Sequence, residues 1–203
     1  MNEISVPHFA KVAEADFPSE FGVFRIYGFE AAASDGTEEA VVLKMGDFAE
    51  GLAPLVRIHS ECLTGDVFHS LRCDCRAQLE IALRAIAAEG VGLLIYEHQE
   101  GRGIGLLNKL RAYELQDNGA DTVEANERLG FESDLRNYQL PGAILRYFGL
   151  SAVRLMSNNP AKVDAVERAG VTVEERVPIV ADVVETRRLY LATKREKMGH
   201  LFE

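Results

Sequence analysis

Residues 91–99 read VGLLIYEHQ, a short and nearly all-apolar segment. A strand of this kind is typical of the inside of a sheet, where both of its faces are covered. The segment before it favours a helix, because Leu79, Leu83 and Ile86 recur at helical spacing and Gly90 stands where a helix would end. We therefore expect a sheet with helices packed against it.

Further strands and helices are predicted on both sides of this segment. Strand-like patterns lie at residues 22–31, 39–46, 52–60, 151–157 and 171–179, and helical patterns at 104–119, 141–150, 160–170 and 184–202. Residues 1–20 are polar and give no clear pattern. The sequence predicts an α+β (mixed α/β) fold, with one domain over residues 1–203, a mixed sheet flanked by helices and a strand-rich N-terminal part.

Charge and hydropathy restrict the partners of the chain. A formal net charge of −10 argues against general binding to nucleic acid, which needs a basic surface, although a few arginines in one cleft can still attract a small anion. No apolar run reaches the roughly 20 residues that span a bilayer. The N-terminus lacks the basic-then-apolar pattern of a secretory signal. We expect a cytoplasmic protein with no nucleic-acid or membrane partner.

All three cysteines, Cys62, Cys73 and Cys75, lie within fourteen positions of the chain. In a reducing compartment this clustering favours metal binding or catalysis over a disulfide. Thiolates suit zinc, and three protein ligands with one open position are typical of a catalytic zinc site. Two alternatives stay open: a closed structural site with His59 or His69 as the fourth ligand, and a chance cluster of small buried hydrophobic residues.

A glycine-rich stretch with one arginine, residues 98–109 (HQEGRGIGLLNK), follows the buried strand. Glycines there allow close approach of a ligand, but the spacing does not match the fingerprints of dinucleotide or triphosphate loops. Arg102 is the more specific signal, because a guanidinium binds phosphate through two hydrogen bonds. Arg57, Arg136 and Lys162 also lie beside predicted strand ends or loops, so together they can surround an anion.

Four separated segments carry a closer likeness. RIHSECLTGDVFHSLRCDC, HQEGRGIGLLNKLRAYELQDNGADTVEAN, LGFESDLRNY and SNNPAKV occur in this order. With them the chain closely resembles GTP cyclohydrolase II, the first committed enzyme of riboflavin synthesis. The resemblance runs from about residue 52 to the end and is weaker before that.

This resemblance implies an enzyme that uses one zinc ion per subunit, with magnesium on the triphosphate, and that works as a homodimer. It implies that the imidazole ring of GTP is opened, with release of formate and pyrophosphate, to give 2,5-diamino-6-(5-phosphoribosylamino)pyrimidin-4-one. The chain is too short for the dihydroxybutanone phosphate synthase domain that is fused to many relatives, so we expect the monofunctional form.

The resemblance also implies roles for individual residues. The zinc ligands would be Cys62, Cys73 and Cys75. The contacts to GTP would be Arg57, Ile58, His59, Ser60, Glu61, Gln78, Glu100, Gly101, Arg102, Thr122, Ser157 and Lys162. Tyr113 would act in the ring-opening steps, with Asp134 as proton acceptor and Arg136 as nucleophile.

The role of Arg136 can be weighed from its chemistry. A guanidinium has a pKa above about 12 and is a poor nucleophile while it is protonated. A nearby carboxylate such as Asp134 holds that proton in place. We therefore interpret Arg136 as an electrostatic clamp on the α-phosphate rather than as a covalent nucleophile.

Two other functions compete with this interpretation. A specialised paralogue could stop at a formylated pyrimidine or serve a secondary pathway. A non-catalytic regulator could bind the nucleotide and use zinc only as a structural staple, which predicts a fourth protein ligand and no turnover.

Overall fold

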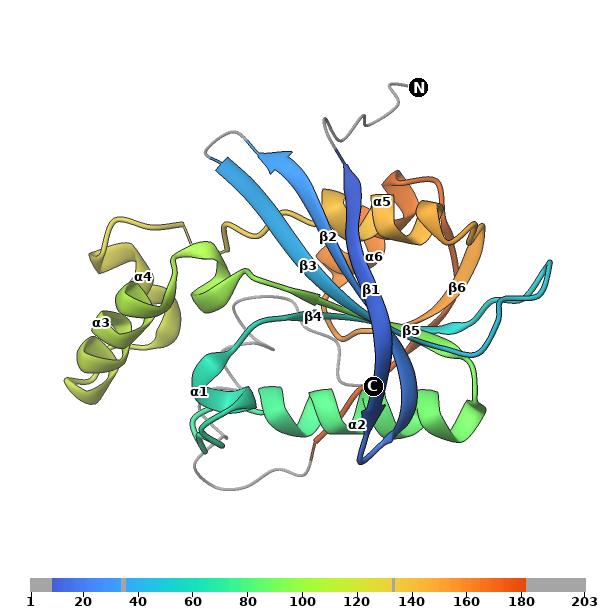
Figure 1. Cartoon of the computed structure of the whole chain (residues 1–203). Coiled ribbons are helices and arrows are strands. Elements are labelled where there is room, and N and C mark those ends of the chain that lie inside the picture. Colours follow the sequence, from blue (N-terminus) through green and yellow to red (C-terminus); the bar gives the residue numbers. More distant parts are fainter. Residues whose placement is uncertain (1–8, 34–35, 133, 182–203) are drawn as a thin grey trace.

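Seven strands form a single sheet in the computed structural model, which describes residues 9–33, 36–132 and 134–181 (Figure 1). The strands are β1 (Ala10–Ser19), β2 (Gly22–Ala33), β3 (Gly36–Met45), β4 (Leu55–Ser60), β5 (Gly92–Glu97), β6 (Ala152–Met156) and β7 (Thr172–Val177). Their spatial order is β1-β2-β3-β5-β4-β6-β7. The predicted mixed sheet is confirmed.

The sheet changes from antiparallel to parallel at its centre. From β1 to β5 each neighbouring pair is antiparallel, whereas β5 with β4, β4 with β6, and β6 with β7 are parallel. Parallel neighbours need crossover connections, and helices supply them. As a result the carboxyl ends of β4, β5 and β6 lie at the same edge of the sheet.

Helices cover both faces of the sheet (Figure 1). The helices within the described ranges are α1 (Leu63–Asp66), α2 (Cys75–Glu89), the 3₁₀ turn η1 (Glu100–Gly103), α3 (Leu106–Asp117), α4 (Thr122–Arg128), α5 (Gln139–Tyr147) and α6 (Pro160–Arg168). In these ranges no helix combines the length and the apolar character that crossing a bilayer requires.

The alternation of side chains along β5 explains why that segment is nearly all apolar. Leu93 and Ile95 point into a core with α5 and α6, whereas Leu94 points into a second core that contains Ile86 of α2. Successive strand residues face opposite sides, so a strand covered on both sides needs apolar residues at nearly every position.

Four elements escaped the sequence-based prediction, namely β1, α4 and the single-turn elements α1 and η1. β1 is exposed along most of its length, and it is a strand because it pairs with β2 over Ala10–Ser19 and not because it has an apolar face. α4 is a short helix that begins at a capping box formed by Asp121 and Glu124. The helix predicted at residues 184–202 lies outside the described residues.

Candidate functional site

A cavity of about 550 Å³ lies at the carboxyl ends of the central parallel strands. Ser60 ends β4, Glu97 ends β5 and Ser157 follows β6. This edge is where open α/β sheets usually bind ligands, because the loops that leave the strands diverge there. The volume suits a small molecule.

The structure brings most of the predicted site residues to this cavity. Those in its lining are Arg57, His59, Ser60, Glu61, Cys62, Cys73, Cys75, Gln78, Glu100, Gly101, Arg102, Tyr113, Arg136, Ser157 and Lys162. These residues come from segments spread over about a hundred positions of the sequence, and the fold brings them together around one cavity.

Two predicted site residues, Ile58 and Asp134, are absent from the cavity lining. The side chain of Ile58 is fully buried in the core, because it points to the opposite face of β4 from Arg57 and His59. Asp134 accepts hydrogen bonds from Nε and Nη2 of Arg136, which does line the cavity. Thr122 is the first residue of α4 and follows Asp121, which does line the cavity.

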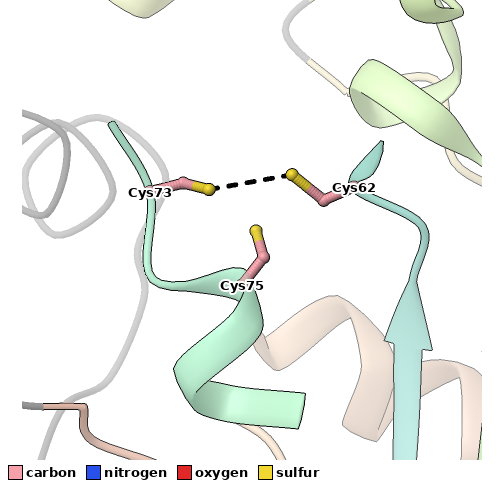
Figure 2. Close-up of side chains that lie close together, drawn as sticks. All are labelled: Cys62, Cys73 and Cys75. Atoms are coloured by element: carbon pink, nitrogen blue, oxygen red, sulfur yellow. Dashed lines mark hydrogen bonds between the residues drawn. The ribbon is translucent and has the colours of Figure 1, made fainter. Parts of the chain in front are cut away.

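The three cysteines meet at one point (Figure 2). Cys62 comes directly before α1, Cys73 lies in the loop before α2, and Cys75 is the first residue of α2. Their sulfur atoms all lie within 4.8 Å of one another, with 3.7 Å between those of Cys62 and Cys73. Tetrahedral thiolate ligands with metal–sulfur bonds of about 2.3 Å would lie roughly 3.8 Å apart. The cluster therefore fits a metal ion.

The surroundings of the sulfurs support the same conclusion. A Cβ atom on Gly65 would lie 2.8 Å from the Cys73 sulfur, so glycine is needed for the close approach of the loop. Hydrogen bonds from the other two thiols hold the pKa of Cys62 far below its usual value, with help from the charge of Lys109. The same coupling raises the pKa of Cys73 to about 11. Each thiolate disfavours ionisation of its neighbours, so the three need a cation to ionise together.

The two histidines considered as a fourth ligand lie elsewhere. The Nε2 atom of His59 is 3.2 Å from both carboxylate oxygens of Asp66, and His69 is exposed in the loop after α1. Among the described residues, the three cysteines alone form a group of metal donors. The described part of the chain thus offers three sulfur ligands, as an open site requires.

Asp66 and Glu97 are site residues that sequence reasoning missed. Asp66 accepts hydrogen bonds from the Cys62 backbone at 3.0 Å and from the Tyr96 hydroxyl at 2.9 Å, so it anchors the first cysteine. Glu97 is 1 % exposed, and burial raises its pKa to about 7. A carboxylate at the end of an apolar strand was the available signal for Glu97.

Two buried cationic side chains, Arg57 and Lys162, line the same cavity as the sulfur cluster and are called the cationic wall below. The Arg57 guanidinium donates to the Met156 carbonyl at 2.9 Å and to Gln78 Oε1 at 2.7 Å. Lys162 is 4 % exposed and donates to the Ile58 carbonyl at 2.8 Å. Burial lowers the pKa of Arg57 to about 10 and that of Lys162 well below its usual value. Burial deprives these cations of hydration, so binding an anionic ligand beside them is favourable.

Arg102 is the clearest single candidate for an anion contact. Both terminal nitrogens of its guanidinium are buried and have no hydrogen-bond partner among the described residues. Its φ of 63° is unusual for a residue with a side chain, and Gly101 beside it has the same φ. Strain of this kind clusters at functional sites. The predicted glycine-rich loop thus forms the turn η1, which directs an arginine into the cavity.

Arg136 and Asp134 form a two-bond ion pair. Arg136 Nε lies 2.8 Å from Asp134 Oδ1, and Nη2 lies 2.5 Å from Oδ2. Burial alone would lower the pKa of Arg136, but the hydrogen bonds to Asp134 outweigh it and raise the pKa above its ordinary value. The remaining nitrogen, Nη1, lies 3.4 Å from Ser60 Oγ. The arginine thus stays charged, with one edge toward the cavity.

Several predicted contacts are already bound within the protein. Glu100 accepts from the Leu63 backbone and from Lys109, each at 2.7 Å, and so connects η1 to α1 and α3. Ser157 exchanges hydrogen bonds with the backbone of Asn159 at the start of α6. Tyr113, in contrast, presents its hydroxyl 3.3 Å from Thr64, next to the sulfur cluster.

Replacing Gly65 by alanine tests the sulfur cluster as a metal site. The added methyl would crowd the Cys73 sulfur, so we expect Gly65→Ala to retain less than half of the bound metal of the wild type after dialysis against a weak chelator. Elemental analysis per chain measures this. Gly28→Ala is the matched control, because no atom lies within 4 Å of its added Cβ. Equal metal contents in all three proteins would contradict the assignment.

Comparison with known proteins agrees with this geometry. The family profile described as GTP cyclohydrolase II matches residues 10–178. Relatives named GTP cyclohydrolase-2 are 54% identical in Hahella chejuensis, 56% in Azotobacter vinelandii and 55% in Pseudomonas syringae pv. tomato, each over 190 residues. These alignments cover 94% of this chain and 91%, 90% and 92% of the relatives. The chain therefore belongs to the GTP cyclohydrolase II family of enzymes.

Proposed function

We propose that this enzyme hydrolyses GTP at a zinc ion held by Cys62, Cys73 and Cys75. It opens the imidazole ring, releases formate and pyrophosphate, and yields 2,5-diamino-6-(5-phosphoribosylamino)pyrimidin-4-one for riboflavin synthesis. One observation carries the proposal: a three-sulfur cluster and a buried cationic wall share one cavity. A metal on the sulfur cluster would activate water for attack on the ring carbon, and the cationic side chains would bind the triphosphate.

At the ring end, zinc with an open coordination position supplies a Lewis acid and an ionised water near neutral pH. Tyr113 lies beside the cluster, 3.3 Å from Thr64. Burial raises the pKa of Tyr113, so its phenol keeps its proton and can donate it to a ring nitrogen. Lys109, which contacts both Cys62 and Glu100, balances the charge of the sulfurs.

At the phosphate end, Arg102, Arg136 and Lys162 would bind the triphosphate, and magnesium would neutralise part of its charge. Arg136 acts as an electrostatic clamp, because Asp134 holds its proton in place and leaves N–H groups of Nη1 and Nη2 to bind a phosphate oxygen. Asp134 then serves mainly to orient Arg136.

The remaining predicted residues complete the nucleotide site. The set assigned to GTP by backbone or side chain is Arg57, Ile58, His59, Ser60, Glu61, Gln78, Glu100, Gly101, Thr122 and Ser157. Within it, Ile58 can contribute only backbone groups, because its side chain is in the core.

The proposal extends to the whole chain. It comprises a single catalytic domain over residues 1–203, a homodimer, and action in the cytoplasm without nucleic-acid or membrane partners. The net charge of −10 supports the exclusion of nucleic acid, which needs a basic surface.

Turnover of GTP before and after metal removal tests the function. We expect formate and pyrophosphate in a 1:1 ratio, loss of both after chelation while the circular dichroism spectrum is retained, and recovery when zinc is added back. A formylated pyrimidine without formate would instead indicate the specialised paralogue. Binding of GTP without turnover would indicate the regulator.

Replacing Arg136 by lysine separates a clamp from a nucleophile. A clamp keeps part of its effect with another cation, so we expect Arg136→Lys to lower kcat by about 10- to 100-fold without abolishing it. Arg111→Lys, on the exposed face of α3, is the matched control and should keep wild-type activity. A trapped phosphorus adduct on Arg136 of the wild type, detected by mass spectrometry, would overturn the clamp.

A further inference from the structure

The loop that carries Arg136 has no helix or strand of its own over residues 134–138. Hydrogen bonds connect this loop, before and after Arg136, to residues 99–102 in and next to η1. The Leu135 N–H donates to the Arg102 carbonyl at 3.0 Å. On the other side, the backbone of Asn137 binds the side chain of Gln99. Arg136 therefore projects from a backbone that is held at the residue before it and at the residue after it.

The Gln99 amide makes a pair of hydrogen bonds with the Asn137 backbone. Its Nε2 donates to the Asn137 carbonyl at 2.6 Å, and its Oε1 accepts from the Asn137 N–H at 2.8 Å. The second Nε2 hydrogen goes to Glu97 Oε1 at 2.9 Å. A flipped amide would set its oxygen against two acceptors, so Glu97 fixes which way the amide points.

Glu97 also contacts Ser60, the last residue of β4. Its other carboxylate oxygen lies 3.5 Å from Ser60 Oγ. That hydroxyl is 3.4 Å from Arg136 Nη1 and 3.3 Å from Lys162 Nζ. One buried carboxylate thus supports both the loop that carries Arg136 and the hydroxyl between the two cations.

The position of the loop matters because Arg136 has one free edge. Asp134 accepts from Nε and from one hydrogen of Nη2, and Ser60 lies 3.4 Å from Nη1, so the remaining hydrogens of Nη1 and Nη2 form the edge left for a ligand in the cavity. A shift of about 1 Å in a reacting or binding group can cost roughly 100-fold in rate.

We propose that Gln99, oriented by Glu97, is a positioning residue that fastens Asn137 and so keeps the free edge of Arg136 over the cavity. This inference rests on the proposed function, in which that edge clamps the phosphate. Gln99 itself lines the cavity, so direct contact with the substrate is the competing explanation.

Two variants of Gln99 and one control test the proposal in the zinc-loaded full chain. Gln99→Met removes both hydrogen bonds to Asn137, and Gln99→Glu keeps the size but loses the donor and faces Glu97 with a like charge. We expect both variants to lower kcat for pyrophosphate release by about 10-fold or more. Gln139→Met, at an exposed side chain of α5, should match the wild type. Wild-type rates in Gln99→Glu would overturn the proposal, because a side chain of the same size would then keep activity without donating to Asn137.

A double-mutant comparison distinguishes positioning from direct contact. If Gln99 acts through Arg136, adding Gln99→Met to Arg136→Lys should lower kcat by less than about 2-fold, whereas independent contacts multiply their losses. Multiplied losses would overturn the proposal.

Hydrogen exchange provides a readout that does not depend on turnover. Peptides covering residues 134–138 should exchange faster in Gln99→Met than in the wild type, with no change over β5 or α2. Unchanged exchange would overturn the positioning role even if the wild type hydrolyses GTP. Faster exchange in Gln99→Met, together with no GTP turnover by the wild type, would instead indicate failure of the proposed function alone.

Discussion

The close approach of three sulfur atoms, which would repel one another as thiolates, is the constraint on which the site depends. The sulfurs of Cys62, Cys73 and Cys75 lie within 4.8 Å of one another, and hydrogen bonding to Cys62 together with burial raises the pKa of Cys73 and Cys75. Gly65 permits this crowding, and Asp66 ties the loop to the end of β4. A divalent cation resolves the repulsion, because it allows all three sulfurs to ionise.

A second electrostatic arrangement complements the first. The chain is acidic as a whole, yet Arg57, Arg102 and Lys162 hold positive charge inside one cavity. Burying positive charge costs free energy, which a bound polyphosphate would offset. The sulfur cluster and the cationic side chains thus give one cavity two chemically different groups, as a nucleotide with a reactive base requires.

Individual residues show which parts of the fold and of the site could be predicted from the sequence. The apolar segment 91–99 predicted β5, and the turn at Gly90 predicted the end of α2, where that residue has φ 70°. β1 was not predictable from periodicity, because its polar residues become a strand only by pairing with β2. Ile58 shows the limit of transferring roles along a motif: its position in the strand turns the side chain away from the site. Asp66 required the tertiary contacts, whereas Glu97 had a sequence signal in its position at the end of an apolar strand.

X-ray absorption at the zinc edge tests the central claim most directly. On the purified, zinc-loaded full chain we predict one zinc per chain, with three sulfur neighbours at about 2.3 Å and one lighter oxygen neighbour. That lighter neighbour should exchange when an anion that binds zinc is added. A fourth sulfur, a histidine imidazole in the fourth position or fewer than three sulfurs would contradict the account.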